Sequence, residues 1–102
     1  MGTPRFSILI PTRDRPVTFR HTLATATSQP GDDYEVVVAD NFGSPATRMI
    51  VDEYMARGRQ IVYLRSDQAL PMGENWERGL RACSGDYVTV LGDDDGLMPT
   101  AL

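Results

Sequence analysis

The chain has 102 residues, with 10 Lys and Arg side chains against 14 Asp and Glu, and a formal net charge of -4. This size suits one small domain or part of a larger one, and the acidic balance argues against a nucleic-acid partner. No apolar run approaches the roughly 20 residues that span a bilayer, and the N-terminus lacks the regions of a signal peptide. The single cysteine excludes an internal disulfide. We expect a soluble, cytoplasmic protein, with peripheral membrane association as an alternative.

Strands and helices alternate along the sequence. Four short apolar runs are nearly continuous and rich in β-branched residues: 6–10, 34–39, 61–64 and 87–91. This pattern is typical of strands buried on both faces of a parallel sheet. Three segments with helical spacing separate them: 16–28, 45–57 and 72–83. The sequence therefore predicts an α/β fold, a Rossmann-like three-layer sandwich with a mostly parallel sheet in strand order 3-2-1-4.

Local signals define the ends and faces of the helices. Asp14 is the candidate N-cap of the first helix. The second begins with Ser44 as N-cap and Pro45 at the first helical position, and it ends at Gly58. The third carries an apolar stripe that we predict to be core: Met72, Trp76, Leu80 and Cys83.

A polar loop follows each predicted strand. The four loops read "PTRDRP", "DNFGSP", "RSDQALP" and "GDDDG". In an open parallel sheet, ligands bind beyond the carboxyl ends of the strands. The sequence therefore predicts one rim that gathers these side chains: Thr12, Arg13, Asp40, Asn41, Asp67 and Asp93 to Asp95.

Three adjacent carboxylates, Asp93, Asp94 and Asp95, follow the last apolar run. Two unit charges about 5 Å apart repel by roughly 1 kcal/mol in water and by about 3 kcal/mol at an effective dielectric near 20. Such a cluster is therefore either well solvated or binds a cation. Composition alone favours a solvated turn with Asp95 and Gly96 at its tip, whereas the position at a strand end favours a cation site.

Four stretches that cover most of the chain carry a family resemblance. They read "SILIPTRDRPVTFRHTLATATSQ", "YEVVVADNFGS", "QIVYLRSDQ" and "ENWERGLRACSGDYVTVLGDDDGLMP". In this order they resemble the N-terminal, nucleotide-sugar-binding half of the family 2 glycosyltransferases of GT-A fold. The resemblance implies that residues 1–102 are the nucleotide-sugar-binding part of a glycosyltransferase domain, truncated before the acceptor-binding part.

The resemblance assigns nucleotide-binding roles to residues that follow three of the strands. The backbone at Pro11 and Thr12 corresponds to the segment that lies against the base, and Arg13 stands where the family usually has an aromatic residue. Asp40 matches the acidic residue that accepts a hydrogen bond from the base, usually uracil. Asp93 is assigned to the ribose or the metal shell.

The same resemblance assigns the metal ligands. The family's acidic D-x-D signature falls on Gly92, Asp93 and Asp94, so its first acid is absent here. The resemblance implies that Asp94 contacts a divalent cation directly, with Asp93 in the same shell and Asp95 as support. Mn²⁺ or Mg²⁺ fits such hard oxygen ligands and stabilises the charge that develops on a departing nucleoside diphosphate.

The resemblance implies an enzyme, an inverting glycosyltransferase that uses a nucleotide-diphosphate sugar, with a UDP-sugar favoured, and an unknown acceptor hydroxyl. This chain is expected to supply donor and metal binding. The family's general base lies beyond the metal motif, so no catalytic base is assigned and it is expected beyond residue 102. We expect the chain by itself to bind donor weakly and to transfer no sugar.

Simpler interpretations compete with these assignments. Arg13 and Arg15 are candidates for surface ion pairs with Asp14 or a neighbour, and for Arg15 we favour this interpretation. A non-catalytic nucleotide- or metal-binding module, or a homodimer formed through an exposed sheet edge, is the alternative function. A phosphoacceptor receiver domain is set aside, because it requires a Lys at the rim and the chain contains none. His21 is expected to be structural or exposed.

Overall fold

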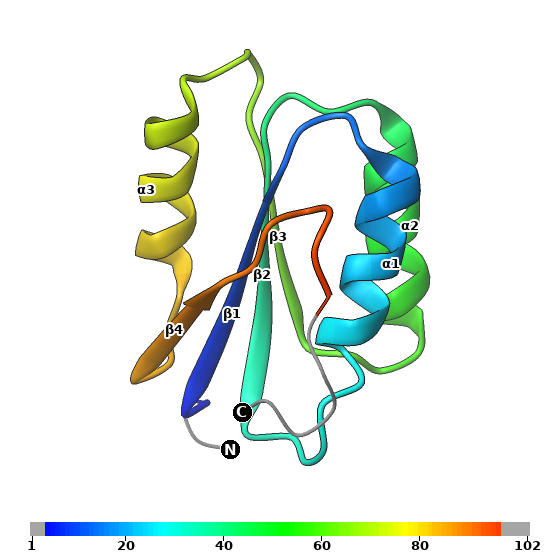
Figure 1. Ribbon diagram of the computed structural model, residues 1–102, viewed down its shortest axis with the longest axis vertical. Coiled ribbons are helices and arrows are strands. Elements are labelled where there is room, and N and C mark those ends of the chain that lie inside the picture. Colours follow the sequence, from blue (N-terminus) through cyan, green and yellow to red (C-terminus); the bar gives the residue numbers. More distant parts are fainter. Residues whose placement is uncertain (1–3, 97–102) are drawn as a thin grey trace.

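The computed structural model describes residues 4–96 as a parallel sheet covered by helices on both faces (Figure 1). The elements are β1 (Phe6–Thr12), α1 (Pro16–Ala26), β2 (Tyr34–Asp40), α2 (Pro45–Ala56), β3 (Ile61–Arg65), α3 (Met72–Ala82) and β4 (Tyr87–Val90). All strand pairs are parallel and the order is β3-β2-β1-β4. The predicted class and strand order are therefore confirmed. None of the helices within residues 4–96 has the length and apolar character needed to cross a bilayer.

The two faces of the sheet bury cores of different size. Helices α1 and α2 lie on one face and enclose the larger cluster, which includes Ile8, Phe19, Leu23, Val36 and Val51. Helix α3 lies alone on the other face, over a smaller cluster of Leu9, Val37 and Ala39. Burial of apolar area is the main stabilising term in folding. The face covered by α1 and α2 therefore contributes most of the stability.

The edge strand β4 is exposed, although its apolar run predicts burial on both faces of the sheet. All seven residues of the central strand β2 are buried, as the continuous apolar run predicts. All four residues of β4 are exposed, so the prediction is wrong for this strand. The physical reason is position, because within residues 4–96 β4 pairs with β1 alone and α3 packs over β2 and β1.

Helix α3 turns a different side toward the sheet from the one predicted. Its buried residues are Asn75 and Gly79. The apolar stripe expected in the core is partly open to solvent, with Trp76 37% exposed and with Met72 and Leu80 more exposed still. The stripe prediction is therefore wrong for these three side chains.

Close approach of α3 to the sheet explains this orientation. A Cβ added at Gly79 would lie 2.5 Å from Leu9 Cδ1 and 3.1 Å from the Cβ of Ala39. Only glycine allows the helix backbone to come so near. Asn75 adds a polar anchor, because its Nδ2 donates to the Ala39 carbonyl at 3.0 Å.

The observed start of α2 matches the predicted one, whereas the N-cap of α1 is not the predicted residue. Ser44 and Pro45 occupy the N-cap and first position of α2, although the Ser44 side chain makes no capping bond. Gly58 follows α2 with a φ of +85°. The N-cap of α1 is Arg15 rather than Asp14. Asp14 instead adopts a φ of +51°, and its Oδ1 accepts a hydrogen bond from Ser44 N–H at 2.8 Å.

Candidate functional site

A cleft of about 470 Å³ lies at the carboxyl ends of the strands. One group of lining residues comes from the end of β1 and from the loops after β1 and β4 and is mostly polar: Pro11, Thr12, Arg13, Arg15, Gly92 and Asp93. Another comes from α3 and the loop before it and is apolar: Leu70, Met72 and Trp76. Asn41 and Asn75 complete the lining. The cleft therefore suits a ligand that combines charged groups with a flat or apolar group.

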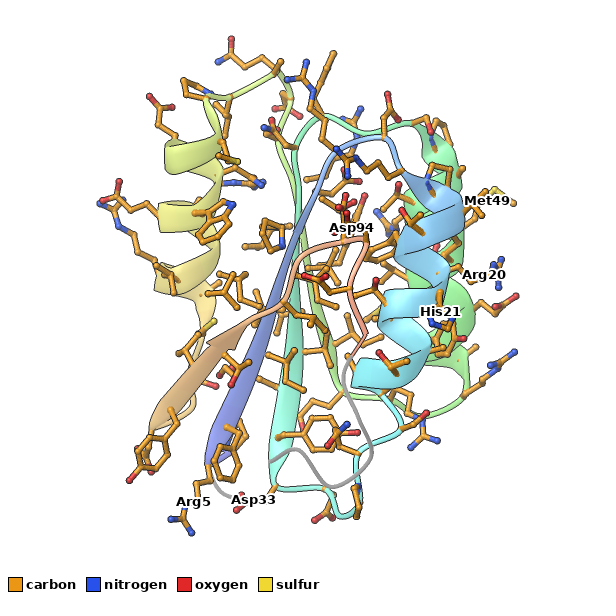
Figure 2. All side chains as sticks on the ribbon, in the orientation of Figure 1. Arg5, Arg20, His21, Asp33, Met49 and Asp94 are labelled. Atoms are coloured by element: carbon orange, nitrogen blue, oxygen red, sulfur yellow. The ribbon has the colours of Figure 1, made fainter. Side chains whose placement is uncertain are left out.

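The cleft brings together most of the residues predicted to bind a nucleotide. Pro11, Thr12, Arg13 and Asp93 all line it, whereas Asp40 does not. Contact of these residues with a nucleotide stays a prediction. Among the predicted metal ligands, Asp94 and Asp95 lie next to the lining residue Asp93 on the turn that follows β4 (Figure 2).

The acid turn, residues 92–95, is held by hydrogen bonds from two other elements. Thr12, at the end of β1, donates its Oγ1 proton to Asp93 Oδ2 at 2.9 Å. Thr22, in α1, donates to the backbone carbonyls of Asp93, at 3.0 Å, and Asp95. A bond from Asp95 N–H to the Gly92 carbonyl, at 3.1 Å, closes the turn. These bonds leave Asp93 Oδ1 and the 60% exposed Asp94 side chain available for other partners.

Arg15 already places a positive charge beside this turn. Its Nη1 lies 3.5 Å from Asp93 Oδ1 and 3.8 Å from Asp94 Oδ2. The surface ion pair expected for Arg15, with Asp14 or a neighbour, is a contact with Asp93 and Asp94 of the acid turn. The Asp93 side chain is only 12% exposed, whereas those of Arg15 and Asp94 are 59% and 60% exposed. The exposed contact with Asp94 is worth about 1 kcal/mol at most.

Asp40 ends β2 in a fully buried position. Its Oδ1 accepts a hydrogen bond from Gly43 N–H at 3.0 Å, and its Oδ2 accepts one from Tyr63 O–H at 2.5 Å. Burial raises the pKa of Asp40 above its ordinary value of 3.8, against the lowering effect of these bonds and of nearby Arg65. Burial and the Asp40 carboxylate also raise the pKa of the Tyr63 phenol. Both Asp40 oxygens are therefore already bonded within the protein.

Asn41 fixes the loop that carries the apolar part of the lining. Its Oδ1 accepts a bond from Leu70 N–H, and its Nδ2 donates to the Leu70 carbonyl, both at 2.8 Å. Its own backbone N–H donates to the Thr12 carbonyl at 2.8 Å. Asn41 therefore joins the ends of β1 and β2 to the segment before α3.

A family model, Glycosyl transferase family 2, matches residues 7–102. The chain belongs to this family. It is 32% identical over 101 residues to the GalNAc(5)-diNAcBac-PP-undecaprenol beta-1,3-glucosyltransferase of Campylobacter jejuni, an alignment that covers 97% of this chain and 32% of that protein. It is also 32% identical over 101 residues to an O-antigen biosynthesis protein of Myxococcus xanthus, covering 97% of this chain and 8% of the relative. The chain thus spans about a third or less of these curated relatives.

Solved structures with a similar fold include that of a mannosyltransferase. The structure of S. aureus TarS 1-349 in complex with UDP has a TM-score of 0.82 and 22% identity, covering 90% of this chain and 28% of that one. The mannosyltransferase PcManGT from Pyrobaculum calidifontis, in complex with GDP-Man and Mn²⁺, has a TM-score of 0.80 and 20% identity, covering 92% of this chain and 28% of that one. These likenesses confirm the GT-A fold.

The acid turn is the candidate site for the divalent cation that the family resemblance implies. A Cβ added at Gly92 would lie 2.8 Å from Asp95 Oδ2 and 3.3 Å from Asp94 Oδ1, so oxygens of two carboxylates face the same small space. Within residues 4–96 no three acidic, His or Cys side chains form a complete metal site. Mg²⁺ commonly uses one or two carboxylates together with substrate phosphates. The turn therefore fits a cation that is shared with a phosphate ligand.

Sequence reasoning missed several residues of this family 2 site. Trp76 and Met72 were predicted to be core and instead line the cleft. Arg15 was predicted to form an ordinary surface ion pair rather than to line the cleft, and Thr22 was not singled out. A signal for Thr22 was present, because it is a hydroxyl residue beside Phe19 and Leu23 on the buried side of α1. A hydroxyl in such a place needs a hydrogen-bond acceptor.

Proposed function

We propose that this chain binds the nucleotide-diphosphate sugar and the divalent cation for a glycosyltransferase that transfers a sugar to an acceptor hydroxyl. The observation that carries the proposal is the cleft in which the loop after β1 faces the acid turn after β4, in a family 2 chain. Neighbours of the same fold include complexes with UDP, UDP-GlcNAc and GDP-Man with Mn²⁺. A UDP-sugar is the favoured donor.

The proposed roles follow the chemistry of the lining. Asp94, Asp93 and Asp95 would hold the cation, and Arg15, which lies beside Asp93 and Asp94, would supply positive charge to the diphosphate. The cation supplies charge stabilisation on the departing nucleoside diphosphate. Pro11 and Thr12 position the nucleotide. The negative charges of the acid turn attract Arg15. Without the cation, the same charges would repel the negatively charged diphosphate.

Recognition of the base is proposed to involve Arg13 and Asp40. Arg13 is exposed in the cleft, where its planar guanidinium can stack on a base. A base contact by Asp40 requires exchange of a hydrogen bond that Tyr63 or Gly43 now makes. The general base for the acceptor hydroxyl is proposed to lie outside residues 1–102.

Calorimetric titration of the chain with UDP, GDP and dTDP tests this proposal. We expect UDP to bind in the presence of Mn²⁺ and to lose most of its affinity when a chelator is added. Because the chain contains one Trp and Trp76 lines the cleft, intrinsic fluorescence gives a second readout of occupancy. Affinity that is indifferent to chelator would contradict the metal assignment, and absence of binding to all three would contradict the function.

A second candidate function is self-association, and the exposed edge of β4 favours it. Tyr87, Val88 and Val90 are large apolar residues that are all exposed on this strand. An uncovered edge strand presents unpaired N–H and C=O groups to another chain. A homodimer that shows no affinity for nucleotides would support this alternative over the first.

A further inference from the structure

Thr22 is a fully buried hydroxyl residue in the middle of α1. Helical Ser and Thr side chains usually bond to a carbonyl three or four residues earlier in their own helix. Thr18 and Thr27 follow this habit, with bonds to the carbonyls of Arg15 and Leu23. Thr22 instead donates to residues that lie more than seventy positions later in the sequence.

The acceptors of Thr22 are two backbone carbonyls of the acid turn, those of Asp93 and Asp95. Because these carbonyls face α1, the turn is oriented relative to the helix. The bond from Thr12 to Asp93 Oδ2 fixes one carboxylate in addition. Figure 2 shows Asp94 on this turn, beside α1. Three adjacent carboxylates repel one another, and the hydrogen bonds from Thr12 and Thr22 oppose this repulsion by holding the turn in one conformation.

We propose that Thr22 is a positioning residue, whose hydroxyl holds the acid turn in the conformation that binds the cation. The inference rests on the proposed function and extends it to a side chain that does not line the cleft. Thr22 touches neither nucleotide nor cation. It acts through hydrogen bonds to the backbone of Asp93 and Asp95. These bonds restrict the conformations of the turn, so less conformational entropy is lost when the carboxylates bind a cation.

Two matched substitutions at this position separate the hydroxyl from the shape of the side chain. Thr22→Val keeps the branched shape and removes the donor, whereas Thr22→Ser keeps the donor. Thr27→Val is the control, because Thr27 is equally buried and its hydroxyl bonds only within the region of α1. Thr22→Ala, with its higher helix propensity, replaces the Val variant if the latter does not fold.

Two affinities are measured. The affinity for Mn²⁺ is obtained from the electron paramagnetic resonance signal of the free ion, and the affinity for UDP is measured with and without Mn²⁺. Thr22→Val removes the hydroxyl that both carbonyls share. This loss should weaken Mn²⁺ binding by about tenfold, with no change in the affinity for UDP in chelator. Thr22→Ser should restore most of the loss, and Thr27→Val should lower the melting temperature without weakening Mn²⁺ binding.

Two results would overturn the inference in distinguishable ways. If the wild-type chain binds UDP with Mn²⁺ and Thr22→Val binds Mn²⁺ as tightly as Thr27→Val, Thr22 is only structural and the proposed function stands. If the wild-type chain binds no Mn²⁺ in the presence of UDP, the proposed function fails and the role of Thr22 fails with it.

Discussion

Strands β2 and β4 both lead into acidic loops at the same end of the sheet, yet the carboxylates lie in opposite environments. β2 is central and wholly buried, whereas β4 is at the edge and wholly exposed. Asp40, at the end of β2, is fully buried, whereas Asp94, after β4, has a side chain that is 60% exposed.

This difference shows what decides whether an acidic residue at a strand end can bind a ligand. A buried carboxylate must be satisfied by the protein itself, because an unpaired charge away from water is costly. Asp40 meets this requirement through Tyr63 and Gly43. The acid turn after β4 remains open to solvent and keeps oxygens available. Four substitutions test this contrast.

The largest effect is expected for Asp40→Ala. It leaves Tyr63 O–H and Gly43 N–H without their acceptor. At about 1 to 3 kcal/mol for each buried group left unpaired, the free energy of unfolding should fall by about 3 kcal/mol in urea titrations. Tyr63→Phe, which removes one of the two donors, should cost about 1 kcal/mol. A loss under about 1 kcal/mol for Asp40→Ala would mean that the two aspartate environments differ little.

Unlike Asp40→Ala, Asp94→Ala should have little effect on the free energy of unfolding and a clear effect on ligand affinity. The free energy of unfolding should change by no more than about 0.5 kcal/mol, as for other surface positions. Affinity for UDP in Mn²⁺ should fall at least about tenfold in calorimetry, which corresponds to about 1.4 kcal/mol. Asp52→Ala makes the same change of charge on the exposed side of α2 and should leave binding unchanged. Equal effects of the two variants would remove Asp94 from the site.

The pH dependence of stability should distinguish Asp40 from a non-titrating variant. Because the folded-state pKa of Asp40 is raised above its ordinary 3.8, the folded chain retains this proton to a higher pH than the unfolded chain. The resulting stability is present below that ordinary value and is lost as the pH rises through the raised pKa. Relative to Asp40→Asn, the wild type should therefore lose stability as the pH rises above about 4. Parallel urea curves for the two proteins across this range would contradict the raised pKa.

The smallest effect is expected at the exposed edge. Val88→Lys places a charge on β4, which should change the free energy of unfolding by about 0.5 kcal/mol or less. It should also lower any concentration-dependent association seen by light scattering. Val17→Lys makes the same change at an exposed position of α1 and should not affect association. If both variants associate as the wild type does, the β4 edge is not the contact.

The strand order and most element ends could be predicted because they depend on local patterns. Continuous apolar runs, Pro45 and Gly58 each act within a few residues, and the rules for connections between parallel strands then leave few strand orders, of which 3-2-1-4 is the one observed. The placement of the acid turn after the last strand follows from the same pattern.

The parts that could not be predicted depend on close contacts between distant segments. The orientation of α3 depends on the space that Gly79 leaves beside Leu9, and the periodicity of the helix does not reveal it. The burial of Asp40 depends on Tyr63 reaching across from β3. The contact of Arg15 with Asp93 and Asp94 likewise joins residues that are far apart in the sequence.

The hydrogen bond between Asp14 and Ser44 ties the loop after β1 to the start of α2. Together with the bond from Asn41 N–H to the Thr12 carbonyl, it makes these two loops a single ordered unit before any ligand arrives. Fixing the backbone of a free residue costs about 1 to 2 kcal/mol in conformational entropy. A ligand that binds in the cleft therefore meets a preorganised wall on the side formed by these loops, and it gives up little of its interaction energy to order that wall.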